Sequence, residues 1–369
     1  MALILSEEEK MLKSSAKEFL AERSPVEALR RLRDSKDSYG YDRSLWREMA
    51  EMGWTALTID EAYGGLGFGY VGLGQIMEEC GRTLAASPMV STALLGTTVI
   101  SLGGSEAQKQ ALLPEIMEGS MITALAFEEK NSHRPFDVST TAEKSGDGYK
   151  ITGKKVFVLD GHVADKLIVS AMADGELSLF IVDAKAAGIS IERKFMMDSR
   201  NAASVSLENV AVKADDRVGG KEVLEKSLDI SRICLSAEMV GTMQEAFERT
   251  IAYLKERQQF GVPIGSFQAL QHRAAHMFSE IELCKAMTLK CLQAIDKEDK
   301  HLAAKASMLK AKVGEVLKLV SNEGVQMFGG IGVTDDEEIG FFMKRARVAQ
   351  QTFGDYNYHL DRFATINGF

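Results

Sequence analysis

The sequence predicts a mainly helical α+β protein in which a β domain separates two helical domains. Three observations lead to this prediction. Helical patterns fill residues 6–122, short β-branched runs with turn residues between them fill about 123–215, and long near-heptad apolar stripes follow from about 222. The length of 369 residues also exceeds the size at which one core usually stops growing. We therefore expect three domains, at 1–122, 123–220 and 221–369.

The first domain begins with a helix-start signal. Ser6 is followed three residues later by Glu9, which is the spacing of a capping box, and an apolar stripe continues from Leu12 to Leu20. A second helix is expected over 43–52, and further helices over 75–84, 91–102 and 105–118.

A glycine-rich segment interrupts these helices. Gly67, Gly69 and Gly72 match the dinucleotide-binding pattern G-x-G-x-x-G, which has that function only after a buried strand and within a βαβ unit. Residues 55–59 make a short strand at best, and helical patterns follow them. We therefore favour a flexible loop that packs beneath a substrate site.

Periodicity defines the other two domains. Runs at 149–159, 166–171, 177–182 and 204–210 predict strands, and Gly146-Asp147-Gly148 and Asp174-Gly175 supply the turn chemistry of hairpins. Apolar residues then step by three and four along 230–254, 267–295 and 302–320. Such stripes predict long helices packed as a bundle.

Composition narrows the function classes. A formal net charge of −9 argues against a general nucleic-acid or anionic-membrane surface, and no run of 18 apolar residues could span a membrane. The four cysteines form no recognisable pattern, and the initial apolar run is too short for a secretory signal, so we expect a cytoplasmic protein with buried thiols. His272 and His276 have zinc-compatible spacing but lack a third ligand, so we expect no metal site.

Two motifs of the last domain suit a phosphate-bearing cofactor. Arg257-Gln-Gln-Phe260-Gly261 forms a turn between predicted helices, where a guanidinium can bind pyrophosphate. Gln326-Met-Phe-Gly329-Gly330 ends a later helix, and its glycines let main-chain N–H groups approach a ligand. The first motif alone is more simply a solvated helix hairpin.

In this order, the two motifs resemble the C-terminal half of the acyl-CoA dehydrogenase family. The similarity extends through most of the chain, at 45–54, 64–67, 151–158 and 228–232. It implies an N-terminal helical domain, a middle β-barrel domain and a C-terminal four-helix bundle. It also implies FAD-dependent α,β-dehydrogenation of an acyl-CoA thioester in lipid metabolism, with electrons passing to an electron-transfer flavoprotein.

The resemblance further implies roles for individual residues, in a tetramer where protomers share the cofactor. The implied FAD contacts are Arg257, Phe260, Gln268, Gln326, Gly329 and Gly330, with the flavin ring near Phe157 and Val158 of the β domain. Arg232 and Asp229 are expected to bind the substrate at its thioester end.

The sequence departs from the family at the catalytic base. Phe353 stands where most members carry a glutamate, and Ser231 stands at the position that a minority use. Asp355 could be an unusual base, although an aspartate after glycine more often caps a turn.

A second chain could also supply the base. Phe353-Gly354-Asp355 resembles the small subunit of heteromeric pimeloyl-CoA dehydrogenases and of related enzymes for bulky, steroid-side-chain or dicarboxylic thioesters, in which a partner chain would carry it. A catalytically silent flavoprotein subunit and a nitroalkane-oxidase-like enzyme with an aspartate base are further possibilities.

The phosphate-binding segment of the β domain is also altered. Glu128 keeps its family position, but the glycines expected after it are absent. His133 and Arg134 could substitute as phosphate partners, or the segment is a solvated loop.

Overall fold

The computed structural model describes residues 3–369, which form two compact units. The helical unit contains the chain up to Arg31, Tyr70–Ala85 and Arg232–Phe369, and the sheet unit contains Leu32–Gly69 and Ala86–Ser231. Each unit therefore joins stretches that lie far apart in the sequence. The boundaries expected near 122 and 220 fall where β1 and α7 begin, but the three-domain division itself stays a prediction.

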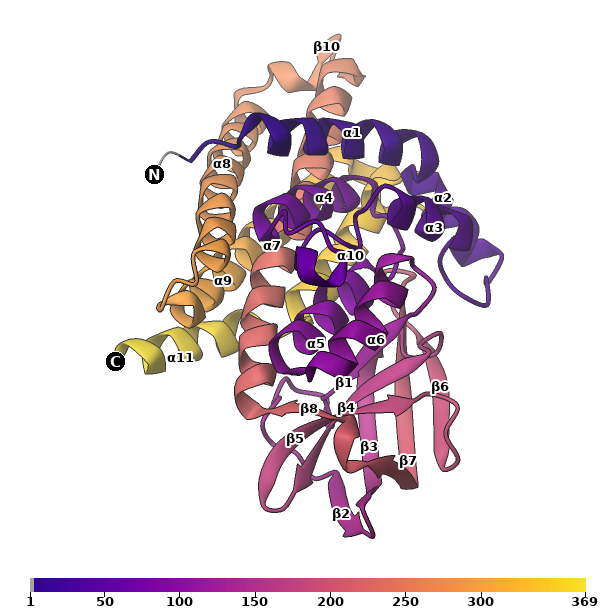
Figure 1. The fold of residues 1–369 in the computed structure, drawn as a ribbon. Helices are drawn as coiled ribbons and strands as arrows, with labels where there is room; N and C mark the ends of the chain where they lie inside the picture. Colours follow the sequence, from indigo (N-terminus) through magenta and orange to yellow (C-terminus); the bar gives the residue numbers. More distant parts are fainter. Residues whose placement is uncertain (1–2) are drawn as a thin grey trace. The chain divides into compact units, whose positions relative to one another are not determined.

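Figure 1 shows the elements of the chain. The helices are α1 (Glu7–Arg23), α2 (Val26–Asp34), α3 (Arg43–Glu51), α4 (Tyr70–Thr83), α5 (Thr97–Gly103), α6 (Glu106–Met117), α7 (Lys221–Glu256), α8 (Gln268–Asp296), α9 (Leu302–Phe328), α10 (Ile339–Gln351) and α11 (Tyr356–Asn367), with a π-helix at Met89–Gly96 before α5. The strands are β1 (Thr123–Ala126), β2 (Thr141–Ser145), β3 (Gly148–Leu159), β4 (Lys166–Ala173), β5 (Glu176–Asp183), β6 (Ile189–Phe195), β7 (Asn201–Lys213), β8 (Arg217–Gly220), β9 (Gln258–Gln259) and β10 (Val262–Pro263). The prediction of a mainly helical α+β protein is confirmed. Among residues 3–369, no helix combines the length and the hydropathy needed to cross a membrane.

Helices α1 and α4 both begin on side-chain caps. The Ser6 hydroxyl accepts a hydrogen bond from the Glu9 amide at 3.1 Å, and the Glu9 carboxylate accepts one from the Ser6 amide at 2.7 Å, so the predicted capping box is confirmed. Asp296, at the end of α8, accepts hydrogen bonds from the amides of Tyr70 at 2.7 Å and Val71 at 3.0 Å. These acceptors satisfy donors that a first helical turn leaves unpaired.

Helices α4 and α7 pack with their main chains in direct contact. A Cβ added to Gly81 would lie 1.9 Å from the Glu238 carbonyl oxygen, and a Cβ added to Gly241 would lie 1.7 Å from the Glu78 carbonyl oxygen. The Thr242 hydroxyl also donates to the Gly81 carbonyl at 3.2 Å. Each helix therefore presents a glycine to the backbone of the other, because no larger residue would leave room for so close an approach.

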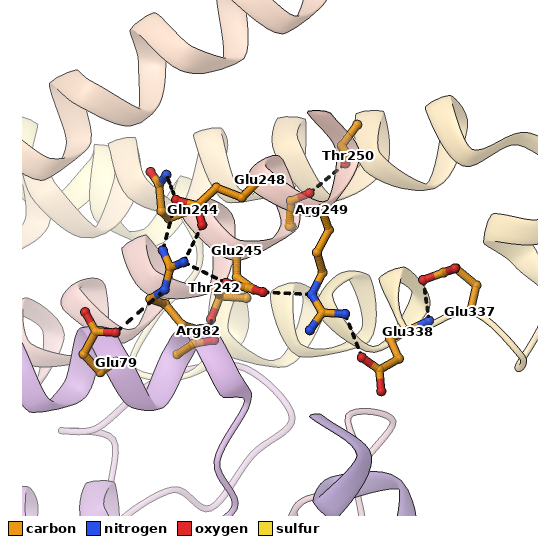
Figure 2. Close-up of polar contacts among 12 residues, drawn as sticks. Glu79, Arg82, Thr242, Gln244, Glu245, Glu248, Arg249, Thr250, Glu337 and Glu338 are labelled. Carbon is orange, nitrogen blue, oxygen red and sulfur yellow. Dashed lines mark hydrogen bonds and ion pairs between the residues drawn. The ribbon is translucent and has the colours of Figure 1, made fainter. Parts of the chain in front are cut away.

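An ion-pair network links the helices at this crossing. Figure 2 shows Arg82 of α4 and Arg249 of α7 among glutamates of the helical unit. Arg82 pairs with Glu248 and, at 2.9 Å, with Glu245, while Arg249 joins Glu245 at 2.9 Å to Glu338 at 2.7 Å. Because several of these side chains remain partly exposed, we expect the network to fix helix geometry more than to supply large stability.

The predicted apolar stripes form the core of the bundle. Their buried members on α8 and α9 include Met277, Ile281, Cys284, Cys291, Ile295, Leu309, Val313, Val316 and Val320. The bundle prediction is therefore confirmed. On α8, however, the predicted stripe starts before the buried residues do, because Phe267, Leu270 and Ala274 remain exposed or half-buried.

The sheet unit carries an eight-stranded, largely antiparallel sheet. Its strand order is β6-β7-β3-β2-β4-β5-β8, and β1 pairs in parallel with β4. Asp174 and Gly175, at φ 54° and 86°, form the predicted turn between β4 and β5.

The elements that sequence reasoning missed include α2, α11, the short strands β9 and β10, and four strands of the large sheet, β1, β2, β6 and β8. Thr123–Ala126 is buried at every position and so shows no alternation. Ile189–Phe195 contains Glu192, Arg193 and Lys194, whose consecutive charges conceal a strand. β6 pairs along its whole length with β7, so its conformation depends on a partner strand that periodicity cannot reveal.

The glycine-rich segment is a loop, as predicted. The amides of Gly67 and Gly69 donate to the carbonyls of Ile59 at 2.9 Å and Leu57 at 3.1 Å, and Gly72 belongs to α4. The segment is not the turn of a βαβ unit, so the dinucleotide-turn interpretation is wrong.

Candidate functional site

The turn between α10 and α11 carries the residue at the position expected for a catalytic base. Phe353 has φ 62° and Gly354 has φ 108°, and Asp355 is the residue from which α11 begins. The Phe353 side chain is buried. A bulky residue with positive φ is strained, and it persists only where the surroundings hold it.

Two buried side chains donate to one main-chain oxygen of this turn. Arg232 Nε lies 3.0 Å from the Phe353 carbonyl oxygen, and His359 Nε2 lies 3.1 Å from the same atom. Because a carbonyl only accepts, His359 carries a proton on Nε2. Its Nδ1 lies 3.3 Å from the Ser307 hydroxyl, which also accepts from Arg362 at 2.9 Å. A chain of hydrogen bonds from Arg362 therefore ends on the turn.

Lys310 of α9 holds the same turn. Its ammonium group donates to the carbonyl oxygens of Gln350 at 3.0 Å and Gly354 at 3.1 Å. Burial, and then the charge of Arg232, lower the pKa of Lys310 to about 7, although Asp355 opposes this shift. Carbonyls of three residues in and before the turn are thus fixed by buried donors.

Asp355 caps α11, since one of its carboxylate oxygens accepts a hydrogen bond from the Tyr358 amide at 2.8 Å. Ser231, at the alternative base position, is buried and donates its hydroxyl to the Ser227 carbonyl at 2.7 Å. Asp229 is also buried on α7. A catalytic role for Asp355 and a substrate-binding role for Asp229 stay predictions.

The two predicted cofactor motifs meet where α7 and α9 end. The rings of Tyr253 and Phe328 stack with centroids 4.3 Å apart and 16° between their planes. Arg257 follows Tyr253 by about one helical turn, and Gly329 follows Phe328 directly. Segments far apart in the sequence are therefore brought to the same end of the bundle.

The residues of these motifs are open to a ligand. Phe260 is 91% exposed at φ 55°. A Cβ added to Gly329 or Gly330 would meet nothing within 4 Å, so the main chain there is accessible. Arg257 takes part in no ion pair among residues 3–369. The remaining predicted contacts, Gln268 and Gln326, are exposed as well.

In the sheet unit, β3 presents Phe157 at an irregularity of the sheet. The register between β3 and β7 shifts between Lys155 and Val158, and Phe157 lies there at φ 53° with 37% of its surface exposed. An exposed aromatic ring in a strained conformation at a bulge is typical of a binding surface. Val158 is buried in the sheet core, so only its main chain could face a ligand.

Two carboxylates hold the loop after β1. Glu128 is hydrogen-bonded to His133 Nδ1 and accepts from the Arg134 amide at 3.3 Å. Glu129 accepts from the buried Lys155 ammonium at 2.7 Å. Burial raises the pKa of Glu129, but hydrogen bonds from Lys155 and from main-chain and side-chain donors nearby outweigh burial and lower it to about 2. His133 therefore contacts Glu128 in this structure, and only Arg134 extends an exposed side chain.

Metal ligands do not gather in the part of the chain that the structure describes. No three His, Cys, Asp or Glu side chains there are grouped as a metal site requires. His272 and His276 both lie exposed on α8.

Comparison with known proteins decides the family. Models of the acyl-CoA dehydrogenase N-terminal, middle and C-terminal domains match residues 6–120, 124–210 and 219–366. Isovaleryl-CoA dehydrogenase of Pongo abelii is 30% identical over 93% of this chain and 85% of its own length. The chain belongs to the acyl-CoA dehydrogenase family. Members of this family are FAD-dependent flavoproteins, and the chain is an oxidoreductase that acts on acyl-CoA.

Solved structures share the acyl-CoA dehydrogenase fold over the whole chain. The ChsE4-ChsE5 complex from Mycobacterium tuberculosis superposes with a TM-score of 0.93 at 24% identity, covering 100% of this chain and 99% of the other. A variant of the Tcur3481-Tcur3483 steroid ACAD superposes with a TM-score of 0.90 at 30% identity, covering 98% of each chain.

Sequence reasoning did not single out Lys310 and Ser307, which hold the turn of this acyl-CoA dehydrogenase. A signal for Lys310 was present, because it lies between Leu309 and Val313 on the apolar face of α9. A lysine on a buried face is rarely left without a polar partner. The identity of that partner depended on the fold.

Proposed function

We propose that this chain is one subunit of a heteromeric FAD-dependent acyl-CoA dehydrogenase in which a second chain supplies the catalytic base. The turn at 353–355 carries this proposal. Removal of the α-proton of a thioester needs a proton acceptor, and Phe353 has none. Asp355 is engaged as a helix cap, and the turn is fixed by Arg232, His359 and Lys310. A turn that is fixed in this way is better suited to line the substrate site than to provide the catalytic base.

Similarity supports a heteromeric arrangement and a bulky substrate. The steroid ACAD at 30% identity has a name that joins two components, Tcur3481 and Tcur3483. We therefore infer an acyl-CoA thioester with a steroid-side-chain or other bulky acyl group, with a dicarboxylic acyl-CoA as the alternative from the resemblance to pimeloyl-CoA dehydrogenases. The proposed assembly is a heterotetramer in the cytoplasm that passes electrons to an electron-transfer flavoprotein.

The residues present fit FAD. In the helical unit, Arg257 has a guanidinium free to bind phosphate, the amides at Gly329 and Gly330 are accessible, and Phe260 offers an exposed ring. The sheet unit, taken by itself, offers the exposed ring of Phe157. Bound FAD would accept the hydride that leaves the β-carbon of the substrate. The contribution of this chain is to bind and orient the cofactor with these groups.

Arg232 is the residue that we expect to shape the substrate site near the thioester. Its Nε donates to the Phe353 carbonyl, so it holds the Phe353 turn in place. We infer that Arg232 shapes the site near the thioester through this turn. Asp229, three residues earlier on α7, is the second expected contributor.

The test compares the chain alone with the chain co-expressed with the product of a neighbouring reading frame. Each preparation is titrated with acyl-CoAs in the presence of a dye acceptor while the visible flavin absorption is followed. Bleaching that requires both chains supports the proposal. Bleaching of the chain alone that is lost in Asp355→Asn would make Asp355 the base and overturn it. A flavin-containing complex that no acyl-CoA bleaches would identify a silent subunit instead.

A further inference from the structure

We infer that Tyr253 is a positioning residue that fixes the relative positions of the two turns proposed to bind FAD, which together form a dinucleotide-binding surface. The inference rests on the FAD site of the proposed function. One half is the turn after α7, which presents Arg257 and Phe260, and the other is the turn after α9, which presents Gly329 and Gly330. Tyr253 precedes the first turn and contacts the residue just before the second.

Tyr253 joins the two helices with both its ring and its hydroxyl. The ring stacks on Phe328 at 4.3 Å, and the hydroxyl donates to the Phe328 carbonyl oxygen at 3.3 Å. Phe328 is the last residue of α9, so its carbonyl is one of those that the helix itself leaves without a partner. One side chain thus packs against the end of α9 and caps it.

The backbone transmits the position of Tyr253 to the first motif. The Arg257 amide donates to the Tyr253 carbonyl at 2.9 Å, which keeps the last turn of the helix rigid up to the motif. The Ile264 amide then donates to the Arg257 carbonyl at 2.8 Å and closes the hairpin that carries Phe260. A displacement of Tyr253 would therefore displace Arg257 and Phe260 together.

The same contact defines the second motif. The Gly329 amide donates back to the Gln326 carbonyl, so the glycine turn starts from a fixed Phe328. About one turn earlier the helices are already close, because a Cβ on Gly324 would lie 3.2 Å from the Thr250 hydroxyl. The stacked rings continue this contact to the end of α9. A ligand held by both motifs is sensitive to small errors in their relative placement.

The test measures FAD binding to the apoprotein by flavin fluorescence, alongside the thermal unfolding of the apoprotein. Tyr253→Phe keeps the ring and removes the hydroxyl, and we expect the Kd for FAD to rise by about three- to tenfold, as for one lost hydrogen bond. Tyr253→Leu removes the stack as well, and we expect a rise of more than about tenfold.

Tyr149→Phe is the matched control. Its hydroxyl donates to Asp174 at 2.8 Å, and its ring lies 5.3 Å from that of Phe180, all within the sheet unit, which carries neither motif. We expect the control to leave the Kd for FAD unchanged. Unchanged FAD affinity in both Tyr253 variants, with a lower unfolding temperature, would show a purely structural role and overturn the inference. If Tyr253→Leu does not fold, Tyr253→Phe decides alone. Absence of FAD binding in the unmodified chain would instead overturn the proposed function itself.

Discussion

Glu238 of α7 and Arg345 of α10 form a two-pronged ion pair in the interior of the helical unit. Arg345 Nε and Nη2 each lie 3.0 Å from a different carboxylate oxygen of Glu238. The two side chains are only 2% and 6% exposed. The pair joins the helix that leads into the Phe353 turn to the helix that carries Arg232.

Loss of one partner of this pair should be strongly destabilising. In Glu238→Ala, Arg345 keeps a buried charge without its carboxylate, so we expect the free energy of unfolding in urea to fall by about 3–5 kcal/mol. The double variant Glu238→Leu with Arg345→Met removes both charges, so its free energy of unfolding should fall by much less than that of Glu238→Ala. Glu7→Ala, which breaks the exposed pair with Lys10, should cost less than about 1 kcal/mol. Equal losses in Glu238→Ala and Glu7→Ala would contradict this account.

The glycines between α4 and α7 should not tolerate a methyl group. A Cβ at Gly81 or Gly241 would collide with a backbone oxygen that no rotamer change can move. We expect Gly81→Ala and Gly241→Ala each to lower the free energy of unfolding by about 1–3 kcal/mol or more. Gly314 of α9 is the matched control, because its Cβ would lie 3.9 Å from the nearest atom. Gly314→Ala should stabilise the chain by up to about 1 kcal/mol, and a change of the same sign in all three variants would argue against the collision.

Stability should rise with pH through Lys310. The folded pKa of about 7 lies below the usual value of 10.5, so the unfolded chain binds more protons between these values. Between pH 7 and pH 9 this group alone should add about 2 kcal/mol to the free energy of unfolding. Lys310→Met should lack this increment, which urea unfolding at both pH values can measure. A parallel pH dependence in the variant and the parent chain would show that Lys310 keeps an ordinary pKa.

Asp355 should matter to the fold as a cap. Asparagine caps helices as well as aspartate, so Asp355→Asn should leave stability nearly unchanged, whereas Asp355→Ala should cost about 1 kcal/mol. In the two-chain enzyme we expect Asp355→Asn to leave the rate of flavin bleaching by acyl-CoA within about twofold of the parent. Stopped-flow absorbance measures this rate, and its loss in a variant of normal stability would assign Asp355 a catalytic role.

Local chemistry allowed much of the fold to be predicted. The Ser6–Glu9 capping box, the Asp174-Gly175 turn and the stripes of α8 and α9 each depend on residues close together in the sequence. The exposed motifs at Arg257 and Gly329 could also be located, because each ends a strongly periodic helix.

Contacts between distant segments could not be predicted in this way. Arg232, Lys310 and His359 converge on one turn from three different helices, and only the tertiary fold brings them together. The Tyr253–Phe328 stack is hidden for the same reason, since each residue alone reads as an ordinary apolar position. The strand β6 depends on pairing with β7, and its consecutive charged residues are not the local pattern expected of a strand.

The close approach of α4 and α7 also bears on how the protein is made. Helix α4 leaves the ribosome before α7, and the part of α7 that contacts α4 follows only after the whole of Ala86–Ser231 has been translated. At ~5–20 residues per second, the face of α4 that packs against α7 stays uncovered for on the order of ten seconds. During that interval we expect chaperones to bind the uncovered face of α4. A fragment that starts at α7 would lack the α4 surface against which α7 packs.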